Sequence, residues 1–354
     1  MSQFRAPARY VQGEGVLDAA GDHLDRIDAT AAVVAGGETA LATAGAPLSD
    51  GLADAGVDHV GTVRGISQST DARIADVIAA ADEGGADLVV GVGGCTAIDA
   101  AKAAAIRGDR SFVAVPTLAS ADGPAGGVAV VYDEAGGIVD VELAARDPEL
   151  VLVDTGVVAA APTHFLRWGL GDSLATVFEA EACAQTGART IHGEETAPTG
   201  LALARETYRV IREHGEQALA DVERGAVTPA VEAVVENTHL TSVLGWENGG
   251  LAGAHALETG LRASGITEPP HGPLVAICTL AELVWQDHER REEVATLLAA
   301  LDFADPIPDG ADVRAGAAVA CDLPMMAHEP VAVDPETATA ALETARDALD
   351  AARA

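Results

Sequence analysis

The sequence predicts an α/β domain with a parallel sheet, followed by an all-α domain. Short apolar runs alternate with helical patterns up to about residue 160, which is typical of a parallel sheet covered by helices on both faces. After Pro162 the strand patterns stop and long helical patterns follow. A chain of 354 residues is long enough for two domains. We therefore expect domains at residues 1–161 and 162–354.

The expected strands are short runs rich in valine, isoleucine, leucine and alanine. Leu88–Val92 is the clearest, because it leads into Gly93-Gly94 and then a helical pattern from Thr96 to Ile106. Asp133–Gly137 separates two further runs and predicts a hairpin. Ser69-Thr70-Asp71 offers an N-cap for a helix through Ala81. The runs are Ala31–Ala35, Val60–Val63, Leu88–Val92, Phe112–Val115, Val128–Tyr132, Ile138–Val141 and Leu150–Val153.

Helical periodicity dominates the second domain. A last helix should begin at Asp334-Pro335, an N-cap followed by proline at the first helical position. The cleft between an α/β domain and a helical domain is a common place for a ligand. The other expected helices are Thr163–Thr186, Leu201–His214, Pro229–Leu244, Glu247–Arg262, Leu274–Asp287 and Arg290–Leu301.

The composition is strongly acidic. Asp and Glu number 55 against 21 Lys and Arg, a formal net charge of −34. Such an excess repels nucleic acid and anionic membranes, so we expect neither as a partner. The acids are dispersed rather than collected in a tail, and Lys102 is the only lysine. This pattern indicates a protein adapted to high salt, where surface charges are screened.

The four cysteines are Cys95, Cys183, Cys278 and Cys321, and they form no CxxC pair. A chain of this length with 49% hydrophobic residues does not need a disulfide framework, so we expect free thiols in a reducing compartment. No signal-peptide pattern precedes the first strand, and no apolar run reaches about 18 residues. We therefore expect a cytoplasmic protein.

The segment from Gly245 to Gly272 contains two histidines, His255 and His271, among small apolar residues. Gly249, Gly250 and Gly253 fall inside its helical pattern, where each costs about 1 kcal/mol relative to alanine. Something must therefore approach that backbone closely. A single histidine in such surroundings is more often a packed core or helix-end residue than a ligand. The spacing also fits neither a zinc finger nor HExxH.

Imidazole is nevertheless the commonest metal ligand at neutral pH. Asp172, in the Gly-Leu-Gly-Asp motif, is the best third candidate.

Two loops at strand ends have the residues expected of a ligand site. Gly91–Asp99 joins a strand to a helix, where glycines and free N–H groups favour a diphosphate. Its spacing is neither GxGxxG nor a P-loop, and a tight turn is the alternative reading. Pro116–Pro124 follows another strand and offers hydroxyls and the Asp122 carboxylate. The carboxyl ends of strands are where open α/β sheets bind ligands, although a simple Ser/Asp turn is the alternative here too.

The order of six motifs resembles glycerol dehydrogenase, in the iron-containing alcohol dehydrogenase superfamily. The similarity covers about Pro7–Trp285, and the superfamily shares its fold with dehydroquinate synthase. The motifs are Tyr10–Gly13 (YVQG), Gly91–Gly94 (GVGG), Pro116–Pro124 (PTLASADGP), Val151–Thr155 (VLVDT), Gly169–Cys183 (GLGDSLATVFEAEAC) and Gly245–Leu261 (GWENGGLAGAHALETGL).

By position, the resemblance implies that Asp172, His255 and His271 bind a catalytic Zn²⁺ or Fe²⁺. Asp122, with Trp246 and His255, would contact the polyol substrate. The cofactor NAD would lie against residues of the two loops and of the predicted hairpin. These residues are Gly93, Gly94, Thr96, Asp99, Thr117, Ser120, Gly126, Val128 and Tyr132.

Departures from the family pattern concentrate on the cofactor side. Gly36 stands where the family commonly has the Asp that binds the adenosine ribose, and Thr96 stands where it has a lysine. Gly126 replaces a serine. Loss of the ribose carboxylate weakens the preference for NAD over NADP, although Glu38 could substitute. No arginine partner for a 2′-phosphate is evident near Gly36. We expect NAD, with NADP also admissible.

The resemblance implies reversible oxidation of glycerol to dihydroxyacetone, with hydride transfer from a metal-bound alkoxide to the nicotinamide. It also implies a homo-oligomer, an octamer in the family. The closest alternatives are sn-glycerol-1-phosphate dehydrogenase, another diol dehydrogenase, and dehydroquinate synthase. Phosphorylated or multiply charged substrates would require cationic ligands, and the chain has one lysine and none near His255. A non-catalytic metal-bound scaffold is the non-enzyme alternative.

Overall fold

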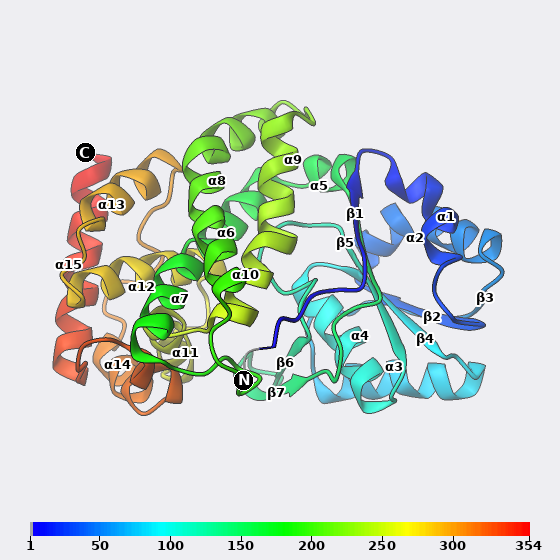
Figure 1. Cartoon of the computed structure of the whole chain (residues 1–354), viewed down its shortest axis with the longest axis horizontal. Helices are drawn as coiled ribbons and strands as arrows, with labels where there is room; N and C mark the ends of the chain where they lie inside the picture. The colour runs from blue at the N-terminus through cyan, green and yellow to red at the C-terminus, as the bar shows by residue number, and fades with distance from the viewer. Residues whose placement is uncertain (1–2) are drawn as a thin grey trace. The chain divides into compact units, whose positions relative to one another are not determined.

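A computed structural model describes residues 3–354, and its contacts divide the chain into two compact units (Figure 1). The α/β unit comprises Arg5–Phe165 and Asp221–Leu240. The helical unit consists mainly of Leu166–Ala220 and Thr241–Ala354. The division lies four residues after the expected one, and Asp221–Leu240 joins the α/β unit. A boundary drawn only from where strand patterns stop does not account for that returning segment.

The sheet of the α/β unit confirms the predicted fold class. Within the described residues it has six strands in the order β1-β8-β5-β4-β2-β3, and every neighbouring pair is parallel. Gly36 is level with Val92, and Gly93 with Pro116, so the carboxyl ends of β2, β4 and β5 lie next to one another. The strands are β1 (Tyr10–Gly13), β2 (Ala31–Gly36), β3 (Asp58–Val63), β4 (Leu88–Gly93), β5 (Ser111–Pro116) and β8 (Leu150–Asp154).

The predicted hairpin is present as a separate two-stranded antiparallel sheet. It pairs β6 (Val128–Tyr132) with β7 (Ile138–Leu143). The Tyr132 N–H donates to the Ser69 carbonyl at 2.8 Å, which ties the end of β6 to the segment before α3 (Asp71–Gly84).

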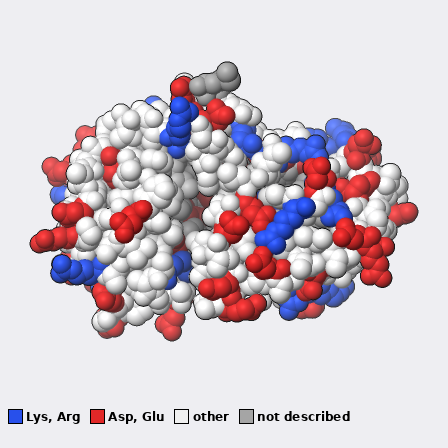
Figure 2. Space-filling model, turned by 90° about the horizontal axis from the view of Figure 1, so that it is seen from below, with Lys and Arg blue, Asp and Glu red and all other residues white. Residues whose placement is uncertain are grey.

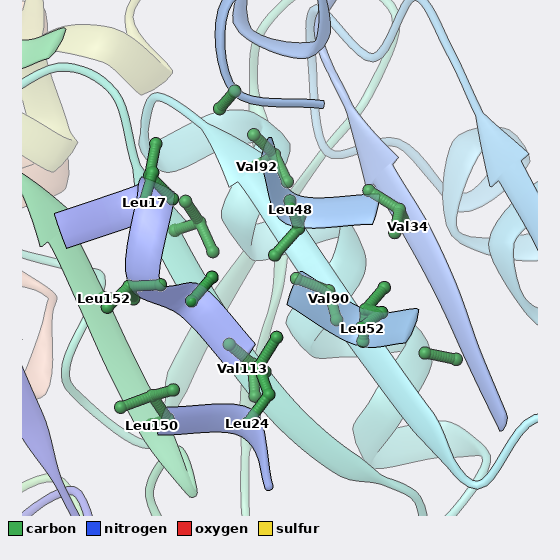
Figure 3. Close-up of a cluster of buried hydrophobic side chains, with 14 of the residues drawn as sticks. Leu17, Leu24, Val34, Leu48, Leu52, Val90, Val92, Val113, Leu150 and Leu152 are labelled. Atoms are coloured by element: carbon green, nitrogen blue, oxygen red, sulfur yellow. The ribbon is translucent and has the colours of Figure 1, made fainter. Parts of the chain in front are cut away.

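Helix α2 (Glu38–Asp54) was not predicted, yet it covers much of the sheet core. It contains Pro47 and many alanines and glycines, which hide its apolar stripe in the sequence. Figure 3 shows Leu48 and Leu52 of this helix over Val90 of the sheet. The remaining helical segments of the unit are η1 (Val16–Ala19), α1 (Ala20–Leu24), α4 (Cys95–Arg107), α5 (Thr155–Ala160) and α9 (Pro229–Glu236).

The helical unit differs from the prediction mainly at helix ends. The expected helix Thr163–Thr186 is two helices, α6 (Thr163–Ser173) and α7 (Ala175–Thr186). The expected helix from Glu247 to Arg262 is wrong, because α10 (Ser242–Gly249) ends at Gly250 with φ of 106° and α11 (Gly253–Ala263) begins afresh. A π-helical turn, η2 (Asn237–Thr241), joins α9 to α10.

The C-terminal part of the helical unit adds α14 and η3, which were not predicted. Asp334 caps α15 as expected, accepting from the Thr337 N–H at 2.8 Å. The other elements are α8 (Pro198–Glu223), α12 (His271–Trp285), α13 (Arg291–Ala300), α14 (Val313–Cys321), η3 (Pro324–His328) and α15 (Pro335–Arg353).

On the face seen in Figure 2, acidic side chains are scattered rather than gathered in one patch. Between residues 3 and 354, none of the helices combines the length and the apolar character that crossing a membrane would require.

Candidate metal centre and cofactor loops

Three predicted ligands come together in the helical unit. Asp172 lies in the last turn of α6, His255 in the first turn of α11, and His271 is the first residue of α12. Each offers one donor atom, and the three donors lie within 4.8 Å of one another. Asp172 Oδ1 is 3.1 Å from His271 Nε2 and 3.6 Å from His255 Nε2. Asp172 and His271, which are 99 positions apart in the sequence, therefore belong to one cluster with His255.

A buried glutamate holds the far nitrogen of each imidazole. Glu179 Oε2 is 2.6 Å from His255 Nδ1, and Glu258 Oε1 is 2.8 Å from His271 Nδ1. Because each carboxylate accepts a hydrogen bond, it keeps a proton on Nδ1 and leaves Nε2 directed at Asp172. Carboxylates placed in this way orient metal-binding histidines and raise their basicity.

The pKa values show that the cluster is built around positive charge. Burial alone would raise the pKa of Asp172, but the charge of His271 and hydrogen bonds from His255 and His271 bring it well below its usual range. Burial lowers the pKa of His271, yet Asp172 and Glu258 together raise it to about 10. The pKa of His255 is likewise raised against burial, chiefly by Glu179. These shifts favour positive charge among the carboxylates, carried either by protonated imidazole or by a bound cation.

The donor set fits a divalent metal ion. One carboxylate oxygen and two imidazole Nε2 atoms are a common set for catalytic zinc, which keeps a further position open. Asp172 is 1% exposed, whereas the His271 side chain is 40% exposed, so the cluster is accessible from the His271 side.

Two glycines beside the ligands let the backbones of α6 and α12 touch. A Cβ on Gly272 would lie 1.9 Å from the Trp168 carbonyl oxygen, and one on Gly171 would lie 2.7 Å from the Gly272 carbonyl oxygen. No larger residue fits either position without separating the helices. The glycines of the two sequence motifs therefore place Asp172 against His271.

Sequence analysis did not identify Glu179 and Glu258. Helical spacing carries a hint of both, because Glu258 is three residues after His255 and Glu179 is seven after Asp172. Arg262, one turn beyond Glu258, forms an ion pair with it. Burial raises the pKa of Glu258, but His271 and Arg262 outweigh it and lower the pKa to about 2.

The predicted cofactor residues gather around the carboxyl ends of β4 and β5 in the α/β unit. The Thr117 N–H donates to the Gly93 carbonyl at 3.0 Å, and the Cys95 thiol lies 3.5 Å from the Ala121 carbonyl. Gly94 is the N-cap of α4 and uses no side-chain cap. The start of α4, which includes Thr96, therefore adjoins the loop that carries Ser120 and Asp122.

Lys102 has a structural role in this region. Its ammonium is buried and donates to the carbonyls of Gly123 at 2.8 Å and Val128 at 2.9 Å. It thereby ties α4 to the Asp122 loop and to the start of β6. Asp99, on the same helix, is also buried. Gly126, Val128 and Tyr132 follow on the segment that Lys102 anchors.

Gly36 ends β2 next to the β4–α4 turn, and it has no room for a side chain. A Cβ there would lie 2.3 Å from the Val92 carbonyl oxygen. Glu38 follows at the start of α2, with Arg64 Nη1 4.0 Å from its Oε2. Both side chains are more than half exposed. An arginine that sequence analysis did not identify thus lies beside the expected ribose position.

The two expected substrate residues outside the metal cluster are both buried. Asp122 is 8% exposed in the loop after β5, and Trp246 is 7% exposed within α10. Asp122 belongs to the α/β unit and Trp246 to the helical unit, so their roles toward a substrate stay predictions.

Comparison with known proteins places this architecture in a family. The model of the iron-containing alcohol dehydrogenases matches residues 7–155. The chain is 39% identical to a glycolaldehyde reductase of Halobacterium salinarum, covering 97% of each chain. It is 36% identical to a glycerol dehydrogenase of Escherichia coli, covering 90% of this chain and 89% of that one.

Among solved structures, a probable glycerol dehydrogenase of Sinorhizobium meliloti superposes with a TM-score of 0.90 at 28% identity, covering 99% of this chain and all of that one. The resemblance seen in the motifs is thereby confirmed. The chain is an alcohol oxidoreductase and belongs to the iron-containing alcohol dehydrogenase family.

Proposed function

We propose that this enzyme reversibly oxidises the secondary hydroxyl of a small polyol, glycerol to dihydroxyacetone, with a divalent zinc ion and NAD. The observation that carries the proposal is the convergence of Asp172, His255 and His271, with a buried glutamate behind each imidazole. Relatives named glycerol dehydrogenase, at 36% and 38% identity, support the substrate class.

The protein would contribute orientation and charge. Asp172, His255 and His271 would hold the ion, which when bound supplies a Lewis acid that lowers the pKa of a substrate hydroxyl. Glu179 and Glu258 keep protons on the Nδ1 atoms and so present Nε2 as the donor. Asp122 would accept a hydrogen bond from a second hydroxyl. Without these groups a polyol would have no fixed orientation toward a nicotinamide.

The cofactor would bind at the β4–α4 turn and the loop after β5. Gly93, Gly94 and Thr96 present the start of α4 to a diphosphate, and Thr117 and Ser120 offer hydroxyls nearby. Asp99, Gly126, Val128 and Tyr132 would complete the lining. Glu38 would accept the ribose hydroxyls in place of the missing Gly36 carboxylate, which favours NAD. Arg64 beside Glu38 is the reason to measure NADP as well.

Reduction of glycolaldehyde is the second candidate, because the Halobacterium salinarum relative carries that name. That reaction is also a hydride transfer, but in the direction of reduction and to an aldehyde carbon rather than from a secondary alcohol. Glycerol 1-phosphate is a weaker candidate, since the only lysine is buried against backbone carbonyls. A non-catalytic scaffold has no reason to retain stoichiometric NADH binding, so a titration with NADH tests that alternative.

The assignment is tested by metal content and turnover together. We expect His271→Ala to lose bound metal while the protein stays folded, and the wild type to turn over glycerol or a small diol with NAD. Steady-state rates should be compared for NAD and NADP, and for glycolaldehyde in the reducing direction. Wild-type metal content after replacing any two of the three ligands would refute the metal site. A lack of turnover with every polyol and with glycolaldehyde would refute the reaction class.

We further propose a cytoplasmic homo-oligomer adapted to high salt. The octamer is the state implied by resemblance. The support for salt adaptation is the net charge of −34 and the scattering of acids over the surface.

A further inference from the structure

The start of α11, the helix that carries His255, is capped by three buried glutamates from elsewhere in the chain. A helix start leaves several backbone N–H groups without intrahelical partners. No side chain of α11 itself caps them, and Ala252 is the N-cap residue. Glu179 comes from α7, Glu282 from α12, and Glu329 from the residue after η3. Glu179 accepts from Ala252 and His255 at 2.9 Å each, Glu329 from Gly253 at 2.9 Å and Glu282 from Ala254 at 3.2 Å.

Two of these glutamates, Glu282 and Glu329, form a pair that does not touch the metal ligands. Glu329 Oε2 accepts from the Trp285 indole at 2.8 Å and from the Gln286 amide at 2.9 Å. The same amide donates to Glu282 Oε1 at 3.0 Å. Glu282 is fully buried and Glu329 is 7% exposed, so two adjacent negative charges would be costly there.

The two acids differ in what surrounds them. Burial and then the charge of Glu329 raise the pKa of Glu282 well above its usual range. Burial also raises the pKa of Glu329, but hydrogen bonds from Gln286, Trp285 and Gly253 oppose the rise. Glu329 accepts three hydrogen bonds and Glu282 accepts two, so Glu329 is the better placed of the pair to carry a negative charge.

We propose that Glu282 and Glu329 are positioning residues for His255, because they fix the first turn of α11 through Ala254 and Gly253. This inference rests on the metal site of the proposed function. The space around Gly253 is full: a Cβ there would lie 2.5 Å from both Glu329 Oε1 and Trp285 Cζ2. Glu282 and Glu329 therefore fix where α11 begins, and His255 follows Gly253 two residues later. Metal–ligand distances tolerate only about 0.2 Å, so a small shift of that turn moves His255 Nε2 out of range.

The proposal assigns a function to the C-terminal segment, beyond Trp285, where the motif similarity ends. Glu329 would act on the metal centre without being one of its ligands.

Paired glutamine substitutions test this assignment. In Glu282→Gln the amide oxygen can still accept from the Ala254 N–H, and only the contact with the Gln286 amide is lost, so zinc affinity should fall far less than in Glu329→Gln. In Glu329→Gln the amide N–H₂ must face the Trp285 and Gln286 donors or the Gly253 N–H. Zinc affinity should then fall by roughly 10–100-fold, the range typical of lost outer-shell contacts. Glu282→Ala should also weaken it.

Zinc affinity is measured on chelator-stripped protein by competition with a chromophoric chelator. The d–d spectrum of added Co²⁺ reports the ligand geometry independently of activity. Glu343→Gln, an exposed glutamate of α15, is the matched control and should match the wild type. If Glu329→Gln does not fold, Gln286→Leu replaces it, since it removes donors to both acids and should also weaken zinc binding.

Equal effects of the two glutamine substitutions would show a packing role only and overturn the proposal. Wild-type affinity and an unchanged Co²⁺ spectrum in Glu329→Gln, or in Gln286→Leu, would do the same. Failure of the wild type itself to bind zinc or Co²⁺ would overturn the metal site together with this inference.

Discussion

Replacing Gly272 by alanine tests how the metal centre is assembled. Gly272 is the second residue of α12, directly after the ligand His271. Alanine is a better helix former than glycine by about 1 kcal/mol, so local propensity predicts a gain in stability. Any loss must therefore come from the contact with α6.

The size of the perturbation follows from the structure. The new Cβ would lie 1.9 Å from the Trp168 carbonyl oxygen, while ordinary Cβ contacts begin at 3.4 Å. The two backbones must separate by the difference, 3.4 − 1.9 = 1.5 Å. This displacement is several times the roughly 0.2 Å that a metal–ligand bond tolerates. We expect zinc affinity to fall by at least about 10–100-fold and the free energy of unfolding to fall by about 1–3 kcal/mol.

The assay combines zinc competition with urea unfolding at constant salt. Gly45→Ala is the control, because Gly45 also lies within a helix and its nearest neighbour would be 3.9 Å from the new Cβ. That variant should bind zinc normally and gain about 0.5–1 kcal/mol. If Gly272→Ala matches Gly45→Ala in both measurements, close approach of the two backbones does not place His271.

Four further predictions concern stability and cofactor choice. Burial lowers the pKa of His239 from 6.5 to about 3, with the backbone of Leu118 opposing it, so the unfolded chain binds a proton that the folded chain refuses. With respect to this group, the free energy of unfolding is highest above about pH 6.5. It falls as the pH drops toward 3, and the loss at pH 5 is about 2 kcal/mol. His239→Gln should remove that part of the pH dependence in urea unfolding between about pH 7.5 and pH 5, and equal slopes would contradict it. Because the net charge is −34, dialysis to low salt should unfold or dissociate the protein. Circular dichroism and light scattering would measure these changes, and full activity in dilute buffer would refute the prediction. Gly36→Asp should destabilise the sheet rather than sharpen NAD selectivity, because its Cβ would meet the Val92 carbonyl at 2.3 Å. Glu38→Gln should instead weaken NAD binding more than NADP binding in a fluorescence titration, and an unchanged ratio would exclude Glu38 from the ribose site.

The sequence by itself determined the fold class, the family and the three metal-ligand candidates. Short apolar runs and helical periodicity are local properties, and so they predicted seven of the eight strands in the described residues and most of the helices. Helix α2 was missed because Pro47 and its glycines interrupt the apolar pattern. Asp172, His255 and His271 could be predicted as metal ligands because the motif around each has an unusual local composition.

Only the tertiary structure decided which groups support those ligands. Glu179 and Glu258 follow the ligands at helical spacing, but whether they accept from an imidazole depends on how helices pack. Glu282 and Glu329 have no sequence pattern that relates them to His255, since three separate elements converge on the start of α11. Likewise, the sequence shows that Lys102 is the only lysine, but not that its ammonium is buried and donates to two backbone carbonyls. Burial is the physical reason: a buried charge or N–H group must find a partner, and which partner is within reach is a property of packing rather than of local sequence.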